Sequence, residues 1–173
     1  MATLARLMPA HQPLLIEPEK YALSGENLSG KLSIQDLSGL SDLVQNRDGT
    51  VKFEMAFSRD NKGWLKATGT ISGSLVLQCQ RCLEAMTHEV HNTIQVVIVN
   101  NQEEIENLPE NFEPFLAEER KISLNKLIEE ELSLALPLSP LHQQKDCPAG
   151  QTVKQQDSNR DSPFAVLKEL KKL

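Results

Sequence analysis

Two of the three cysteines in this 173-residue chain lie close enough in sequence to act on one centre. Cys79 and Cys82 form a C-x-x-C pair, and such a pair serves as half of a metal site, as a redox couple, or as a tight turn built with small apolar side chains. Alternating apolar and polar residues lead into the pair and out of it, so we expect both cysteines at the corner of a long β-hairpin.

A metal site at this corner needs ligands from elsewhere in the chain. His142 and Cys147 are ligand types that tetrahedral Zn²⁺ accepts, and together with Cys79 and Cys82 they complete a set of four. We therefore take these four residues as candidate zinc ligands. The alternative is that Cys79 packs inward at the end of its strand while Cys82 stays an unliganded thiol.

Redox and catalytic chemistry find less support. Redox C-x-x-C pairs lie at helix N-termini, where the helix dipole favours the thiolate, whereas this pair lies between strands. His88 and His91 fall on opposite faces of a predicted strand and do not converge. The sequence has no glycine-rich phosphate loop, nucleophile elbow or H-E-x-x-H motif. We predict a protein that is not an enzyme, with no catalytic residue and no small-molecule substrate.

Three long runs with the two-residue period of β-strands form the centre of the chain. They cover residues 51–58, 65–79 and 86–98, and three consecutive antiparallel strands make a meander. Gly69 and Gly73 on the apolar face of the second run indicate bends or close packing. The predicted class is therefore α+β, with a curled antiparallel β-sheet or partial barrel built on the meander.

A helix is predicted to cover this sheet. Ser123 is a good N-cap, the apolar residues that follow it fall on one helical face, and Pro137 ends the run. The acidic run 129–131 is expected to face solvent. Upstream of the helix, residues 100–119 are acidic and contain two prolines, so we expect an exposed loop there, anchored by its phenylalanines.

The chain divides into four parts. We predict an N-terminal arm over 1–27, an antiparallel α+β domain over 28–142, a flexible polar linker over 143–161 and a short amphipathic helix over 162–173. This helix docks on its own domain or on a partner. Candidate partner-binding residues are Arg81 at the hairpin corner and the apolar side chains of the terminal helix, Phe164, Val166, Leu167 and Leu170.

The composition indicates the cellular compartment and the kind of partner to expect. No apolar run approaches the roughly 18 residues that span a bilayer, and prolines interrupt the first twenty residues, so the expected compartment is the cytoplasm, where thiols stay reduced. Residues 100–147 hold 4 basic and 11 acidic side chains, a net charge of −7. This balance argues against tight independent RNA binding and favours a basic protein partner, although solubility alone is the simpler explanation.

Five stretches of the sequence together resemble one known family. They are LQCQRCL at 77–83, LPENFEP at 108–114, IEEELSLALPLSPLH at 128–142, the isolated Asp-Cys at 146–147 and SPFAVLKELK at 162–171. In this combination the chain closely resembles the bacterial YceD family, the large ribosomal RNA subunit accumulation proteins. The resemblance covers nearly the whole chain beyond the N-terminal arm.

The resemblance implies a cytoplasmic, non-enzymatic factor that supports accumulation of 23S ribosomal RNA and assembly of the large ribosomal subunit. It would act by binding a ribosomal protein, precursor ribosomal RNA or another assembly factor. Many family members carry a second C-x-x-C near the C-terminus, and this sequence departs from that pattern, with only His142 upstream of Cys147. Two alternatives stay open: an RNA-binding or RNA-processing protein acting directly on ribosomal RNA, and a small zinc-binding structural protein.

Overall fold

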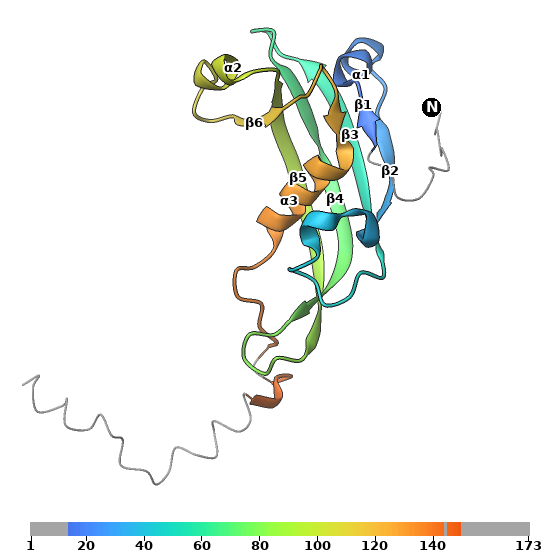
Figure 1. Ribbon diagram of the computed structural model, residues 1–173, viewed down its shortest axis with the longest axis vertical. Coiled ribbons are helices and arrows are strands. Elements are labelled where there is room, and N and C mark those ends of the chain that lie inside the picture. Colours follow the sequence, from blue (N-terminus) through green and yellow to red (C-terminus); the bar gives the residue numbers. More distant parts are fainter. Residues whose placement is uncertain (1–13, 144, 150–173) are drawn as a thin grey trace, which may run out of the picture.

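The computed structural model describes residues 14–143 and 145–149 of the chain (Figure 1). Five strands form its main sheet, in the spatial order β2-β3-β4-β5-β6. Neighbouring strands from β2 to β5 are antiparallel, and β6 runs parallel to β5. The strands are β2 (Leu28–Ser33), β3 (Thr50–Arg59), β4 (Leu65–Gln78), β5 (Ala85–Val99) and β6 (Glu113–Leu116).

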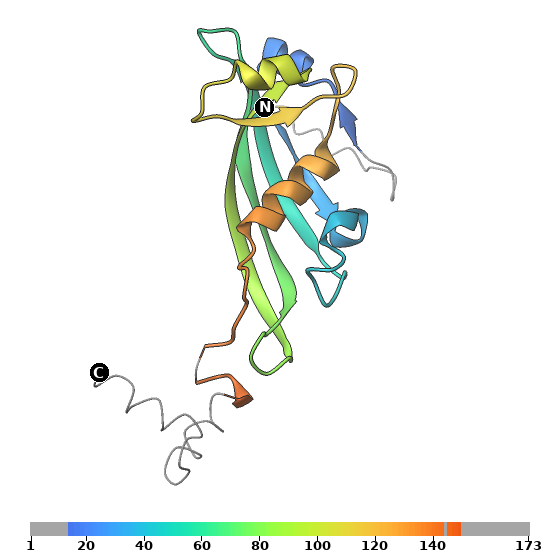
Figure 2. The ribbon, with the colours of Figure 1, turned by 60° about the vertical axis from the view of Figure 1, so that its left-hand side comes forward.

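The remaining elements lie around this sheet. The short strands β1 (Leu15–Ile16) and β7 (Ile122–Ser123) pair with each other. The helices are α1 (Pro18–Ser24), α2 (Gln102–Glu106) and α3 (Leu124–Ala135), with 3-10 turns η1 (Ile34–Asp36) and η2 (Ser38–Leu40) between β2 and β3. Figure 2 shows α3 crossing one face of the sheet diagonally.

The predicted alternation decides which strand residues are buried. Along β3, Val51, Phe53 and Met55 are buried while Lys52 and Glu54 are exposed, as expected for a strand with one face on the core. The three predicted central strands and their antiparallel order are thus confirmed. Because β4 and β5 pair over fourteen consecutive residues, their hairpin extends well beyond the rest of the sheet (Figure 2).

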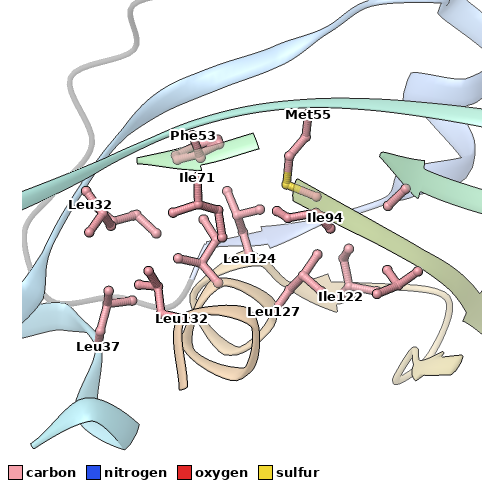
Figure 3. Packing of buried hydrophobic residues seen from close by; sticks show 14 of the residues in the cluster. Leu32, Leu37, Phe53, Met55, Ile71, Ile94, Ile122, Leu124, Leu127 and Leu132 are labelled. Atoms are coloured by element: carbon pink, nitrogen blue, oxygen red, sulfur yellow. The ribbon is translucent and has the colours of Figure 1, made fainter. Parts of the chain in front are cut away.

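Helix α3 closes the core over the sheet, as the sequence predicts. Leu124, Leu127, Ile128 and Leu132 are at most 1% exposed, and Figure 3 shows the helix leucines packed against strand residues such as Ile71 and Ile94. The Ser123 hydroxyl accepts a hydrogen bond from the Lys126 backbone N–H at 3.3 Å and caps the helix. This packing holds the far end of α3 close to the β4-β5 hairpin.

The sheet is neither closed nor curled, so the expectation of a curled sheet or partial barrel is wrong. Strands β2 and β6 lie at opposite ends of the strand order and do not pair. Gly69 serves close packing instead of bending, since a Cβ placed on it would lie 2.1 Å from the Glu54 carbonyl oxygen. Glycine here allows β3 and β4 to approach each other.

Two further expectations are corrected. The acidic stretch before α3 is not simply a loop, because it forms α2 and β6, with Phe115 buried and Phe112 beneath the Lys66 ammonium, 4.2 Å from the ring centroid. Glu131 does not face solvent. It is 7% exposed and turned toward β5, while its neighbour Glu130 is exposed.

The proposed division into four parts remains a prediction. Elements β1 and α1 fall inside the segment 1–27 that we expected as an arm. Most of the predicted linker over 143–161 and all of the predicted helix over 162–173 lie outside the described residues.

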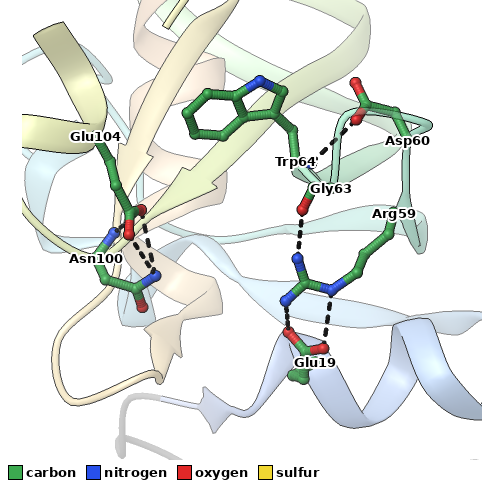
Figure 4. A network of polar contacts seen from close by, with 7 residues as sticks. All are labelled: Glu19, Arg59, Asp60, Gly63, Trp64, Asn100 and Glu104. Carbon is green, nitrogen blue, oxygen red and sulfur yellow. Dashed lines mark hydrogen bonds and ion pairs between the residues drawn. The ribbon is translucent and has the colours of Figure 1, made fainter. Parts of the chain in front are cut away.

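Polar contacts fasten the end of the sheet that is remote from the hairpin corner (Figure 4). The Arg59 guanidinium donates to the Glu19 carboxylate on α1, with 3.0 Å between Nε and Oε1, and to the Gly63 carbonyl. The Asn100 backbone N–H donates to the Glu104 carboxylate of α2 at 2.8 Å. Among the described helices, none is long and apolar enough to cross a membrane.

Candidate metal centre

The four candidate ligands come from two separate parts of the chain. Cys79 follows β4 directly, and Cys82 lies in the six-residue connection to β5. His142 lies at the end of the segment that follows α3, and Cys147 lies just beyond it. The fold brings these two parts together, because α3 directs the chain toward the tip of the long hairpin (Figure 2).

Backbone hydrogen bonds shape the hairpin corner. The Cys79 N–H donates to the Glu84 carbonyl at 2.9 Å, and the Leu83 N–H donates to the Cys79 carbonyl at 2.8 Å. Leu83 adopts a left-handed conformation with φ of 63°, which is uncommon for a leucine. The corner is therefore a tight turn that places both cysteine side chains on the same side as the incoming segment 136–142.

Two hydrogen bonds dock the second part onto the first. The Gln80 N–H donates to the Pro140 carbonyl at 2.8 Å, and the His142 N–H donates to the Cys79 sulfur at 3.4 Å. The His142 Nδ1 atom lies 3.3 Å from the Cys82 sulfur. These contacts place the imidazole of His142 beside the thiols of the corner.

The ligand atoms form a compact cluster. The sulfurs of Cys79, Cys82 and Cys147 and a ring nitrogen of His142 all lie within 4.8 Å of one another. In a tetrahedral zinc site with Zn–S bonds of about 2.3 Å, neighbouring ligand atoms are about 3.8 Å apart. Cys79 and Cys147 are fully buried, whereas Cys82 and His142 are half-buried. The cluster has the number, type and spacing of ligand atoms that a structural zinc site requires.

The electrostatics of the cluster favour a cation. Burial opposes ionisation of Cys79, but the backbone N–H groups of Cys82, His142 and Arg81 lower the pKa of this thiol to about 5. For Cys82, a backbone hydrogen bond at Glu84 lowers the pKa, but burial and the sulfurs of Cys79 and Cys147 outweigh it and raise the pKa. The opposite shifts of Cys79 and Cys82 mean that these two thiols resist ionising together, and a cation bound between them would favour both thiolates.

The cysteines carry no disulfide. Cys79, Cys82 and Cys147 are all free thiols, and Cys79 lies after a strand and not at a helix N-terminus. This setting lacks the helix dipole that lowers the thiol pKa in C-x-x-C oxidoreductases. The chemistry that fits the arrangement best is ligation of a soft or borderline metal ion, with zinc the first choice for sulfur and imidazole ligands.

The other predicted site residues are more scattered. Arg81 is exposed at the hairpin corner. His88 and His91 lie on opposite faces of β5, paired with Leu75 and Ser72 of β4, as predicted. The predicted partner-binding residues of the terminal helix, Phe164, Val166, Leu167 and Leu170, lie outside the described part of the chain.

One feature of this region is not evident from the sequence. Leu83, Leu138 and Leu141, which lie on the two segments that carry the candidate ligands, are exposed apolar residues, and Leu138 is fully exposed. The leucines of 134–141 follow a helical pattern into a proline-rich segment, so their exposure depends on where the helix ends and how the segment docks. The segment docks through the hydrogen bond from the Gln80 N–H to the Pro140 carbonyl, and no local pattern predicts this contact.

Comparison with known proteins places the chain in a family. Residues 67–171 match the family described as "Large ribosomal RNA subunit accumulation protein YceD". A curated protein of the same description from Haemophilus influenzae is 28% identical over 166 residues, which cover 92% of this chain and 95% of the relative. No solved structure matches the chain significantly. The matched region contains all four residues of the cluster.

Proposed function

This chain belongs to the YceD family of large ribosomal RNA subunit accumulation proteins, and we propose that it supports 23S ribosomal RNA accumulation by binding and not by catalysis. The family match over residues 67–171 carries the proposal. Membership implies a role in accumulation of large-subunit ribosomal RNA. The binding mechanism, which is our addition, rests on the arrangement of the described side chains.

In this proposal zinc is a structural cofactor. Cys79, Cys82, His142 and Cys147 would supply four protein ligands, and a zinc ion with four protein ligands has no open position for a substrate or an activated water. The metal would join the hairpin corner to the segment after α3. Its role is to stabilise the surface around the corner.

That surface is the part of the molecule we assign to the partner. Arg81 is exposed at the corner, and Leu83 of the corner and Leu138 and Leu141 of the segment docked on it have relative residue exposures of 63%, 106% and 44%. Exposed apolar residues that cluster around a charged group are typical of protein interaction sites. Elsewhere the acidic surface of α2 and β6 favours a basic partner, such as a ribosomal protein or an assembly factor.

Direct RNA binding is the second candidate function. It is favoured only by the family's connection to ribosomal RNA, because the described surface has no cluster of exposed aromatic side chains on which bases could stack. Filter binding of 23S ribosomal RNA fragments at several salt concentrations separates the two. Submicromolar affinity with a steep salt dependence supports direct RNA binding, whereas weak binding at all salt concentrations supports a protein partner.

The main test is genetic. Deletion of the gene in its host should lower the ratio of 23S to 16S ribosomal RNA and the amount of large subunits. A plasmid copy of the chain should restore both. Affinity purification of a tagged chain should then recover large-subunit precursors. The proposal is wrong if deletion leaves the ratio unchanged and the tagged chain recovers no ribosomal component.

A further inference from the structure

Strand β5 has a long edge along which no described residue forms a backbone hydrogen bond. Fourteen of its fifteen residues pair with β4 on one side, but on the other side β6 pairs only with residues 96–99. The outer edge of residues 85–95 therefore faces away from the sheet without a hydrogen-bonded neighbour in the described structure. Figure 2 shows β5 at the margin of the sheet below β6, with the segment after α3 descending on the same side without pairing to it.

An exposed strand edge of this length is normally protected against pairing with other strands. Proteins interrupt such edges with proline, bulges or lysine, because the free N–H and C=O groups otherwise pair with another strand. Residues 85–95 contain no proline and no lysine, and β4 pairs with β5 in continuous register, without a bulge. The edge is thus able to accept an added antiparallel strand.

The sequence of the edge complements itself about its centre. Two copies of β5 related by a twofold axis at Val90 would pair residues whose numbers sum to 180, and this register spans the whole open stretch. On the solvent face this register places Glu89 of each copy opposite His91 of the other copy, so the dimer contains two such pairs. The imidazole can donate to the carboxylate, and such opposed pairs stabilise antiparallel strands.

The core face also matches in this register. Met86 lies opposite Ile94 of the second copy, and Val90 lies opposite itself, which continues the apolar row of the sheet. His88 lies opposite Asn92, the residue that already hydrogen bonds Glu131. Shifting the twofold axis to residue 89 would instead oppose two glutamates, and shifting it to residue 91 would oppose two histidines.

We infer that two copies of this chain associate through the outer edges of β5 over residues 85–95, forming one continuous ten-stranded sheet. The second copy is the occupant that the charges and apolar residues of this edge favour. The inference is independent of the proposed role in ribosomal RNA accumulation.

Sedimentation equilibrium of the full chain, purified with its metal, tests the inference. The wild-type chain should be dimeric at micromolar concentration. E89K and H91E should each weaken the dimer about tenfold or more, because each alters two symmetry-related pairs. The double variant E89K/H91E places a lysine opposite a glutamate again, with the acid now at position 91, and should return the dissociation constant to within about threefold of the wild type.

The controls keep the result specific. Glu89 and His91 are exposed, so these variants should fold, which circular dichroism verifies. E54K makes the same charge change on exposed Glu54 of the interior strand β3 and should leave the dimer unchanged. Four results would each overturn the inference. They are a wild-type chain that is monomeric at all concentrations, a dimer that is insensitive to E89K, equal effects of E89K and E54K, and a double variant whose dimer is not restored. A monomer whose E89K variant loses a ribosomal protein would also overturn it, and would assign the edge to that protein.

Discussion

Asn92 of β5 donates a hydrogen bond from Nδ2 to the Oε2 atom of Glu131 on α3, at 3.1 Å. This bond joins the cover helix to the sheet at a carboxylate that is 7% exposed. Burial, together with the negative charge of Glu113, raises the pKa of Glu131, and the Asn92 bond only partly offsets this effect. A charged Glu131 therefore costs stability in the folded chain.

The first prediction concerns the pH dependence of that cost. Because the folded state holds the Glu131 proton more tightly than the unfolded chain, stability should fall as the pH rises from the ordinary glutamate pKa through the raised one. Glu131→Gln keeps an acceptor for Asn92 without the charge. It should be more stable than the wild type at neutral pH and similar to it near pH 4. Urea unfolding across this pH range measures the difference.

Glu130 provides the matched control. It is the neighbouring acid on α3 and it is exposed, so Glu130→Gln should change stability little at any pH. A stability difference between Glu131→Gln and the wild type that stays constant from pH 4 to 8 would contradict the prediction.

The second prediction concerns the close approach of β3 and β4. A Cβ at Gly69 would lie 2.1 Å from the Glu54 carbonyl oxygen and 3.0 Å from the Met55 Cα, so the backbone has to move to accept it. Gly69→Ala should destabilise the chain by about 3 kcal/mol or more. At Gly73 the closest atom is the Val51 side chain at 2.9 Å, which can adjust, and Gly73→Ala should cost less.

Thermal and urea unfolding of the two glycine variants check this order. Thr68→Ala, at an exposed position next to Gly69, should stay within about 0.5 kcal/mol of the wild type. If Gly73→Ala destabilises the chain more than Gly69→Ala, the explanation of Gly69 by close strand packing is wrong.

The parts of the fold that the sequence predicts are those with a local period or a local cap. Val51, Phe53 and Met55 alternate with polar residues because one face of β3 is buried, and Ser123 caps α3 with its own hydroxyl. The pairing of β6 with β5 has no such signal. Its four residues include Pro114, and the pairing partners are seventeen residues apart in sequence.

The site divides in the same way. The C-x-x-C spacing identifies Cys79 and Cys82 as partners, and ligand chemistry adds His142 and Cys147. Their convergence depends on the length of the β4-β5 hairpin and on the direction in which α3 ends. Neither can be predicted from the residues of the site. Glu131 was expected in solvent because it belongs to an acidic run, but helical geometry turns this one member of the run toward β5.

The third prediction concerns the metal. The chain as purified should hold about one zinc per molecule, and Cys79→Ser should hold less than a tenth of that. Zinc at 100 times its dissociation constant stabilises a fold by about 2.7 kcal/mol. A chelator should therefore lower the melting temperature of the wild type by about 5 to 10 °C, and should leave that of Cys79→Ser unchanged.

Zinc content by atomic emission and calorimetric melting provide the measurements. Bound zinc should be released as the pH falls, because protons compete with the metal for the thiolates and the imidazole. A wild-type chain that is fully folded, free of metal and unaffected by added zinc would exclude a structural zinc site.

The fourth prediction separates the partner surface from the metal it surrounds. Arg81 lies between the two corner cysteines, its side chain is exposed, and the metal needs only its backbone geometry. Arg81→Ala should therefore keep full zinc content and the wild-type melting temperature within about 2 °C, because exposed substitutions rarely change stability by more than about 0.5 kcal/mol. If the corner binds the partner, the same variant should recover at least tenfold less large-subunit material in affinity purification.

Arg47→Ala, at another exposed arginine outside the corner, is the matched control. Equal recovery by the wild type and Arg81→Ala would remove Arg81 from the binding surface, whereas loss of zinc in Arg81→Ala would mean that the side chain supports the metal centre itself.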